Sequence, residues 1–130
     1  MKLLSAKRYG VKLKATIQAT GRLGFPKATS DLLNFSKKGY VKFFLDDEDG
    51  LYLVLLDHVD DDAFKMLCSS GYYSIGTTAL FDELRYDYKK GSIIFTLVRD
   101  ASLDDQCAGE VYKMIKRELK EKQKNEKANI

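Results

Sequence analysis

His58 is the only histidine of this 130-residue chain, and it limits the catalytic chemistry that the sequence can support. Two-histidine metal motifs are excluded, and a Ser-His-Asp or Cys-His device would have to be built around this single side chain. No serine lies in a nucleophile-elbow pattern, and the sequence has no glycine-rich phosphate loop. We therefore expect no enzymatic activity, no metal site and no small-molecule cofactor.

The acidic run Asp46–Gly50 has a composition that suggests calcium binding. An EF-hand loop needs acids at its first, third and fifth positions, glycine at the sixth and glutamate at the twelfth. With Gly50 as the sixth residue, Leu45 takes the first position and Leu56 the twelfth, so the pattern fails. Apolar runs on both sides, 40–45 and 51–56, instead predict a β-hairpin with this loop at its tip.

The charge of the chain is unevenly distributed along the sequence. Residues 1–43 hold ten Lys or Arg against one acid, whereas residues 44–66 hold eight acids against one lysine. Two interpretations stay open. In the first interpretation, the basic block 1–43 binds a polyanion. In the second, the basic and acidic blocks neutralise each other on a bipolar surface.

A second group of residues could bind single-stranded nucleic acid, since tyrosines can stack on bases while cations hold the phosphates. Alternatively, tyrosines that alternate along a strand are part core and part interface. The residues of this group are Tyr72, Tyr73, Arg85, Tyr86, Tyr88, Lys89 and Lys90.

The elements that would position these groups are mostly strands. Residues 11–20 alternate apolar and polar side chains, which predicts a half-buried strand with Lys12 and Lys14 facing water. Helical turns are predicted at 28–35 and 60–68, and near Phe81 and Leu84. A C-terminal helix is predicted over 102–120, because its apolar residues follow a helical stripe. The stripe consists of Leu103, Cys107, Val111, Met114, Ile115 and Leu119.

An internal sequence repeat suggests two related units. Gly21 and Gly71 lie 50 positions apart, and the Lys-Lys-Gly runs that begin at Lys37 and Lys89 lie 52 apart. Each copy reads as strand, turn, Lys-Lys-Gly and strand. Such repetition predicts two halves that pack about a pseudo-twofold axis and share one core.

The predicted fold is therefore mainly β (α+β), a small β-barrel built from two related β-turn-β units plus the C-terminal helix. One domain spans 1–120, with repeats at about 11–57 and 71–99, and residues 121–130 form a frayed tail. The predicted core consists of Leu13, Ile17, Phe25, Leu33, Val41, Phe43, Leu53, Leu55, Ile93, Phe95, Val111 and Ile115. Cys68 and Cys107 are expected to be buried, reduced thiols of a cytoplasmic protein that has no membrane partner.

Residues 14–56 resemble the swapped-hairpin DNA-binding fold of the AbrB/SpoVT family of bacterial regulators and antitoxins. The likeness lies in the strand 14–18, the Gly-Arg-apolar-Pro run that starts at Gly21, the turn ending at Leu33, the Lys38-Gly39 step and the acidic hairpin. In that family two such units interleave into one barrel, usually across a homodimer.

The resemblance implies duplex DNA binding by a basic strand-and-loop face, as in a transcription regulator. By position it points to Arg22 and Lys27, with Lys12 and Lys14 beside them. Lys37 and Lys38 complete the expected DNA-contacting set. The second copy departs from the pattern, because Tyr72 stands where an arginine is expected. A protein-interaction module, with a homodimer or another protein as partner, and a single-stranded nucleic-acid binder are the alternatives.

Overall fold

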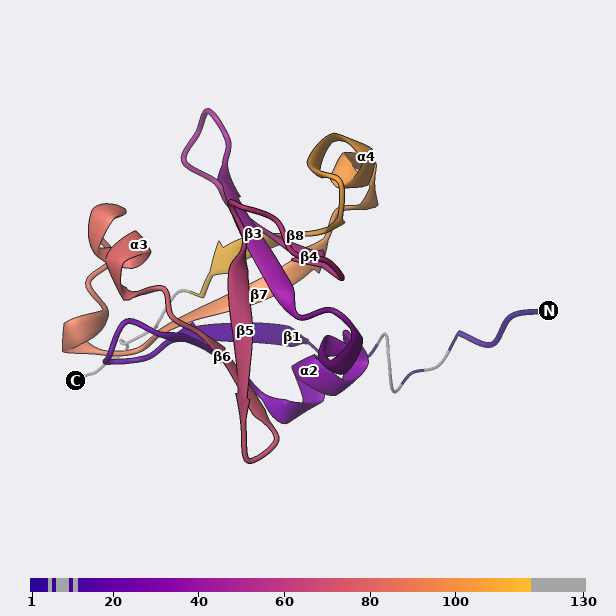
Figure 1. Cartoon of the computed structure of the whole chain (residues 1–130), viewed down its shortest axis with the longest axis horizontal. Coiled ribbons are helices and arrows are strands. Elements are labelled where there is room, and N and C mark those ends of the chain that lie inside the picture. The colour runs from indigo at the N-terminus through magenta and orange to yellow at the C-terminus, as the bar shows by residue number, and fades with distance from the viewer. Residues whose placement is uncertain (5, 7–9, 11, 118–130) are drawn as a thin grey trace, which may run out of the picture.

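The computed structural model describes residues 1–4, 6, 10 and 12–117, and its eight strands form a closed antiparallel barrel (Figure 1). The strands are β1 (Leu13–Ile17), β2 (Leu23–Phe25), β3 (Tyr40–Leu45), β4 (Leu51–Leu56), β5 (Phe64–Ser69), β6 (Tyr72–Ile75), β7 (Ile93–Arg99) and β8 (Glu110–Lys116). Their order around the barrel is β1-β2-β6-β5-β3-β4-β8-β7. The mainly β barrel that the sequence predicts is confirmed.

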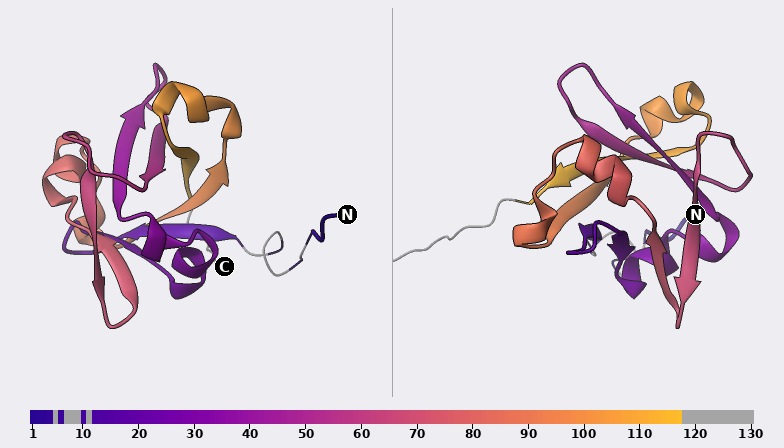
Figure 2. Two further views of the ribbon diagram at one scale, coloured as in Figure 1. Left: turned by 45° about the vertical axis from the view of Figure 1, so that its right-hand side comes forward. Right: turned by 60° about the vertical axis from the view of Figure 1, so that its left-hand side comes forward.

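Short helices connect the strands. They are α2 (Lys27–Leu32), α3 (Thr78–Glu83) and α4 (Asp104–Cys107), with 3-10 turns η1 (Phe35–Lys37), η2 (Tyr88–Lys90) and η3 (Ala101–Leu103). α2 and α3 lie on opposite sides of the barrel (Figures 1 and 2). Phe35, which follows α2, and Phe81, within α3, are almost fully buried, so each helical region adds an aromatic ring to the core.

Strand β1 and the β3–β4 hairpin form as the sequence predicts. Ala15 and Ile17 are fully buried on the inner face of β1, and the hairpin strands have the predicted bounds. The Asp46 carboxylate closes the acidic loop, because its Oδ1 accepts hydrogen bonds from the backbone N–H of Glu48 (2.9 Å) and of Gly50 (2.7 Å). These two bonds lower the pKa of Asp46.

The chain repeats one order of elements. Residues 13–56 run strand, strand, α-helix, 3-10 turn, strand, strand, and residues 64–116 follow the same order with η3 and α4 inserted before the last strand. β1, β2, β3 and β4 of the first half correspond to β5, β6, β7 and β8 of the second half. If each strand is exchanged with its counterpart, the same pairs of strands remain neighbours in the barrel. The strands β5 and β8 that complete the second half lie outside the range 71–99.

Backbone conformations recur at matching positions of the two halves. Gly21 and Gly71 both have positive φ, at 87° and 83°. The residue that follows each helix C-cap is left-handed as well, Asn34 with φ 58° and Arg85 with φ 62°. The halves are joined where the Thr77 hydroxyl donates to the backbone oxygen of Gly21 (2.9 Å).

The predicted C-terminal helix is wrong for the residues that the structure describes. Residues 101–107 form η3 and α4, Ala108 takes a left-handed conformation, and 110–116 form β8. Apolar residues at 111, 112, 114 and 115 fit either period, and β8 is selected because it closes the barrel between β4 and β7. Residues 118–120 of this helix and the predicted tail 121–130 lie outside the described residues.

Because this segment is a strand and not a helix, two predicted core residues lie outside the barrel core. Ile115 is 46% exposed on the outer face of β8. Val111 is buried, but against Cys107 of α4 on the outside of the barrel, whereas Tyr112 and Met114 point into the core. The other predicted core residues are buried, apart from Leu13 and Phe43, which are partly buried and pack against the core.

The helical turn predicted at 60–68 is also wrong, because 64–69 form strand β5 between β3 and β6. Met66 points inward and is 6% exposed, whereas its neighbour Leu67 is 49% exposed. Cys68 lies near the end of this strand. Its thiol is therefore exposed rather than buried, while Cys107 is buried as predicted.

Candidate nucleic-acid interface

Part of the basic block is neutralised by carboxylates. Lys38 Nζ lies 3.6 Å from a carboxylate oxygen of Glu110, and Lys27 Nζ lies 3.7 Å from Asp31 one helical turn away. Lys42 of β3 forms a shorter ion pair of 2.7 Å with Asp60. Of these three pairs, Lys42–Asp60 joins the basic block to the acidic block 44–66, as the bipolar interpretation predicts.

Lys14 and Arg22 remain available on the outside of the barrel. Lys14 lies in β1 between two inward-facing residues, and within the described ranges it has no carboxylate partner. Arg22 precedes β2 and donates a hydrogen bond from Nη2 to the Ser74 hydroxyl of β6 (3.0 Å). Lys12 is exposed just before β1. Lys37 is exposed at the end of η1, and the strand register does not place it beside the others.

The register of β1, β7 and β8 extends this surface across the sheet. Lys14 is opposite Thr96 of β7, and Thr96 is opposite Ile115 of β8. One row further along, Ile94 is opposite Thr16, and its carbonyl oxygen accepts a hydrogen bond from the Arg117 N–H (2.8 Å). Since cross-strand partners share a face, Arg117 lies on the same side of the sheet as Lys14.

We call this surface the cationic face. It consists of Lys14, Thr16, Ile94, Thr96, Val98, Lys113, Ile115 and Arg117, with Arg22 at its edge. It contains four cationic side chains and no Asp or Glu. Lys113 lies over the Tyr52 ring at 5.8 Å from its centroid. Lys113 also lies near the Asp46 carboxylate and, after the backbone bonds from Gly50 and Glu48, helps to lower its pKa. Among the described residues, no carboxylate forms an ion pair with Lys14, Arg22 or Arg117, so these three cations could meet a phosphate backbone.

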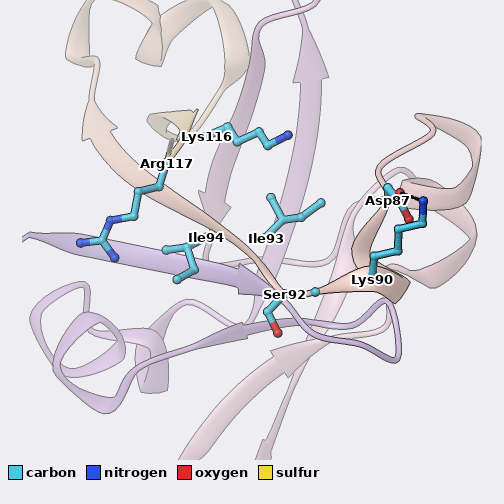
Figure 3. A pocket seen from close by; sticks show the side chains of 8 residues that line it. Asp87, Lys90, Ser92, Ile93, Ile94, Lys116 and Arg117 are labelled. Atoms are coloured by element: carbon cyan, nitrogen blue, oxygen red, sulfur yellow. Dashed lines mark ion pairs between the residues drawn. The ribbon is translucent and has the colours of Figure 1, made fainter. Parts of the chain in front are cut away.

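A pocket of about 390 Å³ opens where the cationic face meets the start of β7 (Figure 3). In Figure 3 the Arg117 side chain extends on the side of Ile94, and the Lys116 side chain on the side of Ile93. Lys90 also lies on the side of Ile93 and pairs with Asp87 at 3.7 Å. Lys113, Lys116 and Arg117 were not among the predicted site residues, because the sequence pattern predicted a helix over this segment.

The tyrosine group is largely removed from the surface. Tyr88 is 2% exposed, and its hydroxyl donates a hydrogen bond to the Asp82 carboxylate, which raises the Tyr88 pKa. Tyr73 and Tyr86 are partly buried. The Tyr73 ring packs against Phe35, and the Tyr86 ring packs against Phe81 and Phe95. Tyr72, at 59% exposure, is the member of the group that could stack on a base.

The Arg99–Asp104 ion pair is a structural feature beside the interface. Nη1 and Nη2 of Arg99 donate to Oδ1 and Oδ2 of Asp104, each at 2.6 Å. Oδ1 of Asp104 also accepts a hydrogen bond from the Val111 N–H (3.1 Å). The bonds from Arg99 hold the pKa of Asp104 at about 2. This pair fixes α4 against the start of β8.

Comparison with known proteins returned no matching family model, no matching curated protein and no matching solved structure. Among the described residues, no three His, Cys, Asp or Glu side chains gather where they could hold a metal ion. No helix in this part of the chain has the length and apolar character needed to cross a membrane.

Proposed function

We propose that this protein binds nucleic acid, and duplex DNA in particular, by laying the cationic face against the phosphate backbone. One observation carries the proposal. Across three neighbouring strands the outward residues that the structure describes include Lys14, Lys113 and Arg117 but no carboxylate, while Glu110 and Asp60 pair with other lysines. An acid-free cationic surface attracts a polyanion through counterion release.

The proposal includes an AbrB/SpoVT-like origin, in which the two halves of one chain replace the two subunits of a homodimer. It is supported by the repeated order of elements, by the exchange of strand pairs and by the matching positive φ angles of Gly21 and Gly71. The halves differ where contact with DNA is expected. Gly24 of β2 is opposite Ser74 of β6, so Arg22 matches Tyr72 in the second half. The protein would therefore hold DNA with one half, as a cytoplasmic transcription regulator that contacts a single half-site.

The test is duplex affinity at low salt, measured by fluorescence anisotropy. The variant Lys14→Gln/Arg22→Gln should bind more weakly than the wild type on every duplex sequence, because phosphate contacts carry no base information. Lys65→Gln is the matched control, because Lys65 is exposed on β5, four strands away from β7 around the barrel. Wild-type protein that retains no duplex at low salt would remove the proposal.

A protein-interaction module is the second candidate, with a second copy of this chain as the partner. It is favoured by Phe44 and Leu45 at the end of β3, which are 39% and 49% exposed. They border a hollow of about 240 Å³ together with Tyr52, Leu103 and Cys107. Self-association there would bury apolar groups and resist salt, whereas DNA binding would weaken with salt. Leu45→Asp should abolish dimers seen by light scattering without reducing affinity for DNA.

A further inference from the structure

The pocket beside the cationic face is concave and has an accessible main chain. Its floor is the extended segment 91–94, and a Cβ atom added at Gly91 would meet no other atom within 4 Å. Lys90 and Lys116 lie on the side of Ile93, and Arg117 lies on the side of Ile94 (Figure 3). These cations come from η2 and from the end of β8, which only the fold brings together.

The lining favours an anion of more than one charge. Three cations and one acid, Asp87, line the pocket. The Lys90–Asp87 pair has side-chain exposures of 87% and 65%. A pair exposed to this extent contributes little to stability, so Lys90 is available for a stronger anionic partner.

A phosphomonoester has the chemistry that this pocket matches. It carries a charge of about −1.5 to −2 at pH 7, and its three oxygens accept charge-assisted hydrogen bonds from Lys and Arg. The internal diester of a polynucleotide carries one charge and no free end. The volume of about 390 Å³ leaves room beyond the phosphate, and the partly exposed Ile94 offers apolar surface to the attached sugar or base.

We infer that this pocket binds the phosphomonoester of a nucleotide. Two sources supply that group, namely the phosphorylated end of a polynucleotide that lies on the cationic face, or a free mononucleotide. The first source rests on the proposed function. The second does not, because a mononucleotide needs only the pocket.

The experiment measures anisotropy of an internally labelled duplex that carries a terminal phosphate at the 5′ end, at the 3′ end or at neither. We expect one phosphorylated form to bind about tenfold more tightly, the gain typical of a charge-assisted contact. Lys116→Gln/Arg117→Gln should abolish this difference. Lys89→Gln should preserve it, because Lys89 neighbours Lys90 in η2 but does not line the pocket.

Titration of the full chain with AMP, followed by amide chemical shifts, tests the pocket without a polynucleotide. Shifts centred on Gly91, Ser92 and Lys116 would support the inference even if no duplex bound, in which case the proposed function alone would fail. A terminal-phosphate preference without AMP binding would assign the pocket to polynucleotide ends. Equal affinity for all three duplexes, together with no shifts at millimolar AMP, would overturn the inference and leave duplex binding by Lys14 and Arg22 intact.

Discussion

Tyr112 and Ile115 distinguish the strand at the C-terminal end of the barrel from a helix. A helix places Ile115 in the core and Tyr112 away from the apolar stripe, whereas β8 buries Tyr112 to 1% exposure and leaves Ile115 46% exposed. Tyr112→Ala should therefore cost about 3–5 kcal/mol, the range for removing a buried aromatic ring. Ile115→Ala should cost about 1 kcal/mol or less, because about half of the side chain is already in water and the substitution removes only partial burial and some strand propensity.

Urea unfolding of both variants measures this difference. With a slope of about 2 kcal/mol/M, typical of a small protein, Tyr112→Ala should lower the midpoint by about 2 M and Ile115→Ala by about 0.5 M or less. The control is an unchanged slope, which shows that stability and not the compactness of the unfolded state has changed. A larger loss for Ile115→Ala than for Tyr112→Ala would refute the inward direction of Tyr112 and with it the closure of the barrel by β8.

Two further predictions concern the ion pair beside α4 and the turn before β2. The pKa of Asp104 is held at about 2, below its ordinary value of 3.8, so the contact with Arg99 stabilises the fold above about pH 4 and is lost as the pH falls from 4 towards 2. Asp104→Asn should flatten the pH dependence of the urea midpoint over this range, and an unchanged profile would contradict the assignment. Gly39→Ala should cost about 1–2 kcal/mol of stability, because alanine disfavours the positive φ of this residue. Gly21→Ala should be more destabilising. The reason is that an added Cβ at Gly21 would lie 2.9 Å from Thr78, whereas Gly39 has open space; equal losses in thermal unfolding would contradict it.

The sequence predicted the elements in which one period dominates. Alternation around Ala15 and Ile17 fits a strand, and the apolar runs that flank Asp46–Gly50 are short and bounded by a glycine-containing loop, which favours a hairpin. The segments 64–69 and 110–116 could not be assigned in the same way. Their apolar residues satisfy both periods, and the choice is made by neighbouring strands that are distant in the sequence.

The candidate site was predictable to the same extent. Lys14 and Arg22 could be placed on the outer surface from the sequence because their strand and turn were assigned correctly. Arg117 was missed because its place beside β1 depends on β7, which is adjacent to β1 in the barrel but almost eighty residues later in the chain. The ion pair of Lys38 with Glu110 could not be predicted either, since Glu110 also comes from the misassigned segment.

The salt dependence of duplex binding tests the central claim most directly. Log K should fall linearly with log salt for the wild type, with a slope of about 0.9 per phosphate contact. Lys14→Gln/Arg22→Gln should reduce that slope by about 1 to 2 units, and Lys65→Gln should leave it unchanged. Slopes that agree for all three proteins, or binding that does not respond to salt, would contradict the assignment of the cationic face to nucleic acid.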